Sequence, residues 1–176
     1  MKNSKLEINI VALLGAGFLI ASMCFPWWGF FTNNNTESFL YPYVIDGPVV
    51  NMVGYARSPQ MVLLTVGMVV AILLGLLGSF IHKTLGRIFR LLSGLITAFF
   101  IWRFIYRMTE ITSAYNLPLI GVGDAEYSGF FVATATSSFK PGFYLACAGA
   151  ALLLLAVFIP WKIGFGKSNQ PVRTEG

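Results

Sequence analysis

Four long apolar segments constrain this chain more than any other feature of its sequence. They cover residues 8–25, 61–81, 88–106 and 142–159, and each is long enough, or nearly so, for a helix to cross about 30 Å of hydrocarbon. Of all residues, 56% are hydrophobic and 11% are charged, whereas a soluble domain carries about 25% charged residues. We therefore predict an all-α membrane fold, a bundle of four transmembrane helices.

The basic residues that flank these segments predict the orientation of the bundle, because cytoplasmic loops carry an excess of Lys and Arg. With the termini and the connector 82–87 in the cytoplasm, that side holds eight basic residues and the other side four. The eight are Lys2, Lys5, Lys83, Arg87, Arg90, Lys162, Lys167 and Arg173. We expect a multi-pass plasma-membrane protein with cytoplasmic termini, a single membrane domain over residues 1–163 and a flexible cytoplasmic tail over 164–176.

Residues 26–60 and 108–141 then form two outer loops, and neither has the composition of a disordered segment. In the first loop, aromatic runs alternate with polar and Gly-Pro clusters, a pattern typical of strands and turns. In the second, residues 108–116 suit an extension of the third helix, and residues 127–136 are rich in Phe, Val and Thr, which favour strands. We predict a small extracytoplasmic antiparallel β-sheet built from both loops. Asn34 also begins a glycosylation sequon in the first loop.

This layout resembles that of the claudin and peripheral-myelin-type tetraspan proteins. The shared features are cytoplasmic termini, a long first outer loop with strands, a tight inner turn, a third helix that extends outward and a shorter second outer loop. That family's first outer loop carries a Trp, then Gly-Leu-Trp, then two disulfide-bonded cysteines. Here the loop contains Trp27, Trp28, Gly29 and Phe30 and no cysteine. The resemblance implies a four-helix fold with an outer sheet, and no specific activity follows from it.

The sequence contains few groups that could carry catalysis or hold a cofactor. His82 is the single histidine, which excludes bis-histidine haem ligation, and no apolar segment carries two carboxylates. Asp124 and Glu126 fall short of a calcium coordination pattern. Cys24 and Cys147 lie in or beside apolar segments, and we interpret them as small buried hydrophobes. We expect no enzyme activity, no cofactor, no metal and no nucleic-acid partner.

Arg103 and Arg107 are the most informative charges, because they lie four residues apart on one face at the outer end of the third segment. Charges at membrane depth are costly, so they generally have a partner or a task. One interpretation is a site for an anion or a lipid headgroup, or an ion-paired contact with a partner. The other is snorkelling towards the outer headgroups, with Arg107 paired to Glu110.

Small residues recur at four-residue spacing in two segments, which lets helix backbones approach closely in a membrane. We interpret them as packing sites, either within the chain or against another subunit. They are Gly67, Ala71, Gly75 and Ser79 in the second segment and Gly142, Ala146 and Ala150 in the last.

Without catalytic groups, and with aromatic, weakly charged outer loops, the chain is predicted to act by contact. The first hypothesis is a non-catalytic accessory or structural subunit of a larger membrane complex, such as an energy-transducing or oxidoreductase assembly. Its partners would be membrane lipids and other membrane-protein subunits, or copies of itself. The alternatives are a claudin-like adhesion or barrier protein and a small lipid- or anion-binding carrier that uses Arg103 and Arg107.

Aromatic residues are enriched in the cores of protein interfaces, so those of the first outer loop are the candidate contact residues. The competing interpretation is that their rings form the core of the outer loop and the aromatic belt of the membrane. The candidates are Trp27, Trp28, Phe30, Phe31, Tyr41 and Tyr43.

Overall fold

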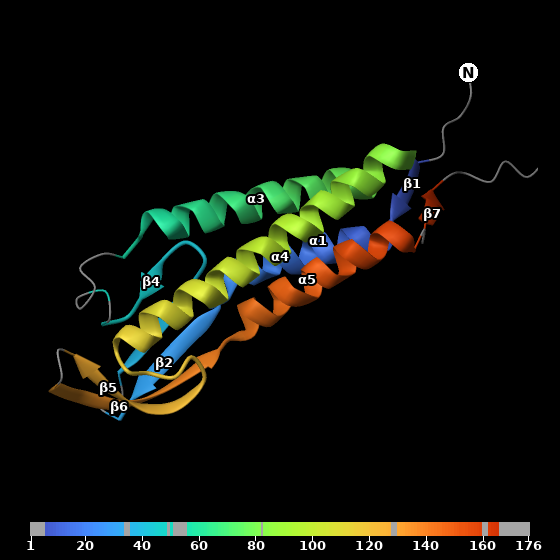
Figure 1. The fold of residues 1–176 in the computed structure, drawn as a ribbon. Coiled ribbons are helices and arrows are strands. Elements are labelled where there is room, and N and C mark those ends of the chain that lie inside the picture. The colour runs from blue at the N-terminus through green and yellow to red at the C-terminus, as the bar shows by residue number, and fades with distance from the viewer. Residues whose placement is uncertain are drawn as a thin grey trace, which may run out of the picture.

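The computed structural model describes residues 6–33, 36–48, 50, 56–81, 83–127, 130–159 and 162–165 as an elongated helical bundle with a β-sheet at one end (Figure 1). Each of α1 and α4 contacts both α3 and α5, so the helices pack in the cyclic order α1, α3, α4, α5. Their bounds are α1 Ile10–Cys24, α3 Pro59–Phe80, α4 Lys83–Ala114 and α5 Pro141–Phe158.

Helix starts follow from local capping chemistry. The side chain of Asn9 accepts a hydrogen bond from the backbone N–H of Ala12 at 3.0 Å, which caps α1. Ser58 caps α3 in the same way through Met61 at 3.3 Å, and Pro59 occupies the first turn, where its missing N–H costs nothing. The starts of α1 and α3 are therefore determined by a few polar and proline residues.

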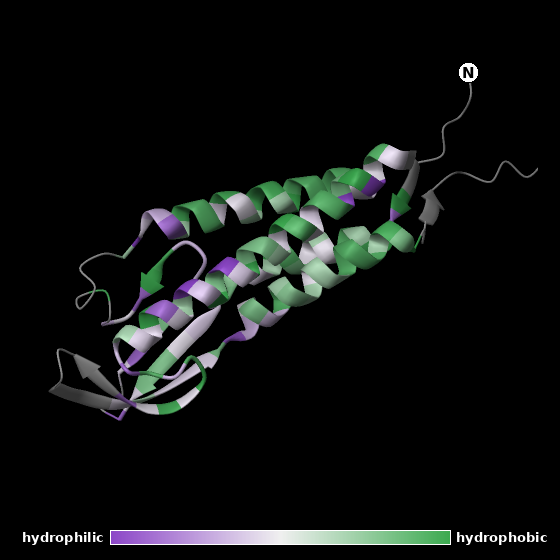
Figure 2. Ribbon diagram, viewed as in Figure 1, coloured by the Kyte–Doolittle hydropathy of each residue, from purple (hydrophilic) through white to green (hydrophobic). Residues whose placement is uncertain are grey.

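Three helical segments are long and apolar enough to cross a membrane: Pro59–Phe80, Thr84–Ala114 and Pro141–Phe158. Figure 2 shows apolar residues over most of the length of the bundle, and many of them face outward. An apolar outer surface of this extent indicates a membrane-embedded protein. The first predicted span, residues 8–25, corresponds to the shorter apolar helix α1. This helix has 15 residues, because residues 6–9 form a strand before it.

The third predicted helix differs from the structure at both ends. α4 begins at Lys83 and ends at Ala114, whereas the predicted apolar span covered residues 88–106. The predicted extension of this helix over 108–116 is confirmed as far as Ala114. On the far end, Phe104, Met108 and Thr112 are all buried and lie four residues apart on one face. This face gives the extension tertiary contacts that a hydropathy window does not detect.

The predicted small antiparallel sheet is confirmed, and it lies at the end of the bundle where α1 ends and α3 and α5 begin, here called the sheet end (Figure 1). The strand order is β4-β3-β2-β6-β5. The central strand β2 pairs with β3 from the first loop and with β6 from the second, so Trp28 lies opposite both Leu40 and Phe139. The bounds are β2 Trp28–Thr32, β3 Glu37–Leu40, β4 Ile45–Asp46, β5 Gly121–Tyr127 and β6 Phe130–Phe139.

A second sheet of two strands closes the opposite end of the bundle. β1 (Leu6–Asn9) pairs antiparallel with β7 (Lys162–Phe165), so segments near both ends of the chain lie side by side (Figure 1). The Asn9 amide also donates to the carbonyl of Ile159 at 3.4 Å. β7 includes the first residues of the predicted tail, and residues 166–176 lie outside the described part of the chain.

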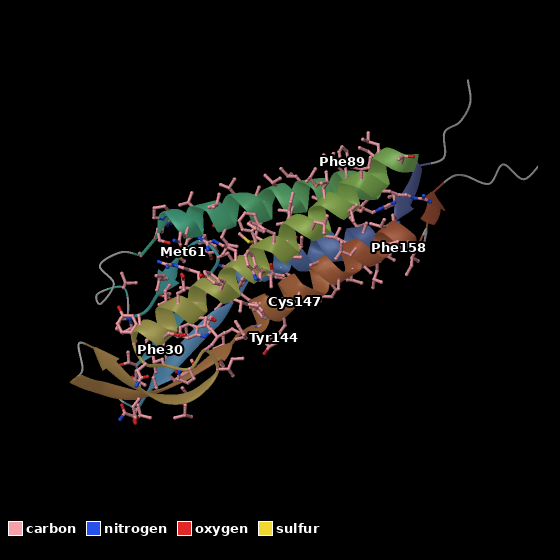
Figure 3. All side chains as sticks on the ribbon, in the orientation of Figure 1. Phe30, Met61, Phe89, Tyr144, Cys147 and Phe158 are labelled. Atoms are coloured by element: carbon pink, nitrogen blue, oxygen red, sulfur yellow. The ribbon has the colours of Figure 1, made fainter. Side chains whose placement is uncertain are left out.

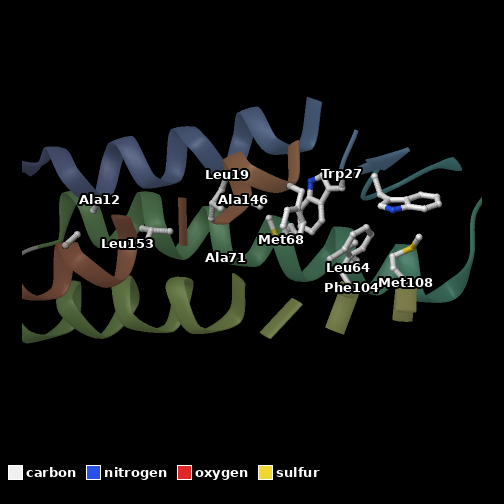
Figure 4. Packing of buried hydrophobic residues seen from close by; sticks show 13 residues of the cluster. Ala12, Leu19, Trp27, Leu64, Met68, Ala71, Phe104, Met108, Ala146 and Leu153 are labelled. Carbon is white, nitrogen blue, oxygen red and sulfur yellow. The ribbon is translucent and has the colours of Figure 1, made fainter. Parts of the chain in front are cut away.

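The core follows the axis of the bundle and continues into the sheet end (Figure 4). Ala12, Ala71 and Ala146 are fully buried and allow close approach of the helices. The larger side chains of Leu153 and Trp27 are also fully buried and fill the space where the helices lie farther apart. Lipid tails are as apolar as these side chains, so tight packing and interhelical hydrogen bonds hold membrane helices together.

Candidate functional site

The two predicted stripes of small residues lie against other helices of the same chain. A Cβ on Gly75 would meet Leu153 and Ser93 at 3.1 Å, and a Cβ on Gly67 would overlap the ring of Phe100. The remaining members are buried as well: Ala71, Ser79, Gly142, Ala146 and Ala150. The contacts of these stripes are therefore intramolecular, and a role in binding another subunit stays a prediction.

Trp27, the first of the aromatic candidates, is fully buried at the joint between α1 and the sheet (Figure 4). Its ring meets Phe104 edge to face at a centroid distance of 5.2 Å and Phe143 at 6.2 Å. Its indole N–H donates to the carbonyl of Ser22 at 3.1 Å. Trp27 thus joins α1, α4 and α5 from within the chain.

The other aromatic candidates differ in their exposure. Trp28 is buried, and its indole N–H donates to the carbonyl of Leu119 at 3.0 Å. Phe30, which Figure 3 labels at the sheet end, Phe31 and Tyr41 are half-buried. Tyr43 is exposed. A partner-contact role stays a prediction for all of them, and Tyr43 offers a partner the most accessible ring.

Phe31 takes part in a cation–π contact that belongs to the sheet itself. The ammonium of Lys140 lies 4.3 Å from the centre of the Phe31 ring and 5.9 Å from that of Phe39. Lys140 stands directly before α5, so this contact ties the start of that helix to the sheet.

Arg103, Arg107 and Glu110 lie on α4 near the sheet end. Nη1 of Arg107 lies 2.7 Å from Oε2 of Glu110, and both side chains are more than 40% exposed. The Arg103 guanidinium lies 6.0 Å from the centre of the Tyr106 ring. Among the described residues, no carboxylate lies within ion-pair distance of Arg103. Of the two cations, Arg103 is the one without an ion-pair partner in the described part of the chain.

Both arginines line a cavity of about 110 Å³ between the start of α3, the sheet-end half of α4 and strands β3 and β4. We call this cavity the α3–α4 groove. Leu40, Ile45 and Leu64 are among the residues that make its wall mainly apolar. The groove therefore combines an apolar wall with a cationic rim.

A second cavity, of about 320 Å³, lies between α4 and strands β2 and β3. It shares Leu40, Ile45, Arg107, Met108 and Ile111 with the α3–α4 groove. Arg107 thus stands where the two cavities meet. The arginine spacing was visible in the sequence, but neither cavity was, because their walls come from segments that only the sheet brings together.

Arg90 is a buried charge that the sequence marked only as part of the basic flank. It lies on α4 at the end opposite the sheet, and its Nη1 donates to the carbonyl of Gly78 at 3.2 Å. This bond satisfies a backbone carbonyl in the last turn of α3, where a cation also complements the helix dipole. Nε of Arg90 has no hydrogen-bond partner within the described structure.

The remaining candidates provide no further site. Cys24 and Cys147 are free thiols. Both were predicted to be buried, but Cys24 is exposed and Cys147 is half-buried. Asp124 accepts a hydrogen bond from the Thr134 hydroxyl at 2.8 Å within the β5–β6 hairpin. No group of three or more potential ligands gathers within the described residues to hold a metal ion. His82 and Asn34 fall outside them.

Membrane-length apolar helices and a sheet on one end of the bundle define a helix-rich, membrane-embedded protein. In sequence comparisons the chain matches no protein-family model and no curated protein. Fold and local geometry are therefore the basis for assigning a function.

Proposed function

We propose that α1, α3, α4 and α5 all cross the plasma membrane, with both termini in the cytoplasm and the five-stranded sheet outside. The pairing of β1 with β7 supports this topology, since a chain whose two ends lie on one side must cross an even number of times. α1 spans only about 22 Å at 1.5 Å per residue. It packs against both α3 and α5, however, and so shares their place in the bundle. The basic residues near the termini agree with this orientation.

Within this topology, the protein acts as a non-catalytic accessory subunit of a larger membrane assembly. The observation that carries this proposal is the open edge of β5. β5 is the last strand in the sheet order, so its outer edge pairs with no other strand of the described chain. Beside this edge, Val122 is 68% exposed and Ile120 is 60% exposed. Both apolar side chains lie at the sheet end, where the proposed topology places water rather than lipid.

An open edge strand presents backbone N–H and C=O groups that another chain can pair with. Asp124 places a charge farther along β5, and the pairing of β5 with β6 becomes irregular between Ala125 and Glu126, so the first part of β5 is uncharged and regularly paired. Val122 lies in that stretch, and Ile120 directly precedes it. An extended segment of another subunit fits this edge, with backbone hydrogen bonds supplying affinity and Ile120 and Val122 supplying apolar contact.

Mild detergent extraction, followed by native-gel mass measurement and mass-spectrometric identification of co-purifying chains, tests the proposal. Wild type is compared with Val122→Lys at the open edge and with the control Asn33→Lys, which adds the same charge at an exposed turn of the sheet. We expect wild type and the control to migrate with a defined larger assembly and Val122→Lys to be released from it.

A single species of monomeric mass in all three samples would refute the subunit proposal. Self-association of wild type between vesicles, abolished by Val122→Lys, would instead support the alternative of a claudin-like adhesion protein. Solute movement by the protein alone in liposomes would support the carrier alternative.

A further inference from the structure

We infer that the α3–α4 groove binds one anionic lipid of the outer leaflet, with its headgroup at Arg103 and Arg107 and its first methylene groups on the apolar wall. The inference uses the topology proposed above and is independent of the edge of β5. It is carried by the position of the groove, by its charge and by the chemistry of its wall.

The position of the groove matches the depth of a lipid headgroup. About 30 Å of helix separates Lys83 from Arg103 at about 1.5 Å per residue, which equals the thickness of the hydrocarbon core. Ser58 and Gln60, at the start of α3, line the same groove. Arg103 therefore lies where hydrocarbon gives way to headgroups, and the groove opens at that level.

The two arginines of the groove differ in their ion pairing. Arg107 has Glu110 as a partner at 2.7 Å, but no described carboxylate lies within ion-pair distance of Arg103. A guanidinium offers five N–H donors in a fixed plane that suits phosphate and carboxylate oxygens. The oxygens of an acidic headgroup at this point would accept hydrogen bonds from Arg103. Their negative charge would also reduce the repulsion between the two arginines.

The wall of the groove favours a lipid over a free anion. Leu63 and Ile111 line the groove beside the arginines, and both of these apolar side chains are exposed. A free phosphate would leave this surface in contact with water, whereas the glycerol and first methylene groups of a lipid would cover it.

The size of the groove also limits how much of the ligand enters. A volume of about 110 Å³ is smaller than the roughly 300–1,000 Å³ of pockets that enclose drug-sized molecules. The remainder of the acyl chains would lie outside, along the exposed apolar faces of α3 and α4, where Val66 and Phe99 already face the lipid.

The test is native mass spectrometry of the protein released from vesicles that contain phosphatidylcholine and the anionic lipid phosphatidylglycerol. Arg103→Gln removes the charge that has no described ion-pair partner, and Leu63→Trp adds bulk to the groove lining while leaving both arginines. Both residues are exposed, so both variants are expected to fold. Arg57→Gln is the matched control, because it removes an exposed charge on the same side of the protein from outside the groove lining.

We expect wild type and Arg57→Gln to retain one phosphatidylglycerol molecule in preference to phosphatidylcholine. Loss of a charge-assisted contact in Arg103→Gln should lower that preference by about tenfold or more. Leu63→Trp should lower retention of the lipid to a similar degree. Addition of inorganic phosphate should leave the retained lipid in place.

Equal retention of the two lipids by wild type would overturn the inference. So would unchanged retention in Arg103→Gln or in Leu63→Trp, or an equal loss in Arg57→Gln. Displacement of the lipid by inorganic phosphate would show that the arginines recognise a free anion instead. Because these measurements do not involve the edge of β5, they can fail while the subunit proposal holds, and the reverse is also true.

Discussion

The ring of Phe100 on α4 lies directly over Gly67 on α3. A Cβ on residue 67 would overlap the ring, so the separation of the two helices at this level depends on a missing side chain. Phe100 also lines the α3–α4 groove. The same contact therefore sets helix packing and shapes the cavity beside it.

Gly67→Ala should lower the free energy of unfolding by about 1–3 kcal/mol, because the added methyl group forces the Phe100 ring and α4 outward. Gly17→Ala is the control, since a Cβ there meets no heavy atom within 4 Å. In that variant, alanine should be neutral or stabilising by up to about 1 kcal/mol through its better helix propensity. Thermal unfolding in detergent distinguishes the two, and equal melting temperatures would contradict the prediction.

Trp27→Ala should destabilise the protein by about 3–5 kcal/mol, because it empties a fully buried site and removes the donor to the Ser22 carbonyl. Trp102→Ala removes the same ring from a site that is 59% exposed on α4. Chemical denaturation should show little change for Trp102→Ala. A similar loss of stability in both variants would contradict the prediction, because it would mean that the burial of Trp27 does not determine the cost of its removal.

Ser93→Ala should cost about 0.5–2 kcal/mol, the range for a hydrogen bond between membrane helices. The Ser93 hydroxyl donates to the carbonyl of Ala71 at 2.6 Å and so links α4 to α3. The Thr109 hydroxyl bonds only within its own helix, to the Ile105 carbonyl at 3.0 Å, which makes Thr109→Ala a suitable comparison. Unfolding of the two variants, measured side by side, should be easier for Ser93→Ala.

Glu110→Gln should leave stability nearly unchanged, because both partners of its ion pair are well exposed. The substitution frees the guanidinium of Arg107 beside the groove. Retention of phosphatidylglycerol, measured by native mass spectrometry, should therefore rise, opposite to the effect of Arg103→Gln. A fall in retention would indicate that Glu110 holds Arg107 in its binding position.

Reporter domains fused to either end of the chain should both report a cytoplasmic location, because β1 and β7 keep the two ends on one side of the bundle. The same reporter inserted at Asn33, an exposed turn of the sheet, should report the opposite compartment. Reporters on opposite sides for the two termini would imply an odd number of crossings and would refute the proposed topology.

The sequence predicted the membrane-length helices well, because long apolar segments bounded by proline admit few other structures. The outward extension of the third helix over 108–116 was also predicted and is confirmed as far as Ala114, although polar residues such as Thr109 and Glu110 kept it out of the hydropathy-defined span. The sequence did not predict β1. Residues 6–9 lie beside an apolar segment, and their strand depends on a partner at the far end of the chain.

The candidate site was predictable only in part. Helical spacing placed Arg103 and Arg107 on one face of α4, which required no tertiary information. The apolar wall required the sheet, because Leu40 and Ile45 reach the groove only when β3 and β4 are paired beside β2. Similarly, burial of Trp27 follows from the rings of Phe104 and Phe143, which belong to helices distant in sequence.

The pairing of β1 with β7 also has a consequence for biosynthesis. Leu6 emerges early during translation, but its partner Phe165 is made after every helix of the bundle. The first strand therefore cannot form this pairing until the last helix has been made. Formation of this short sheet then marks the point at which the newly made chain closes on itself.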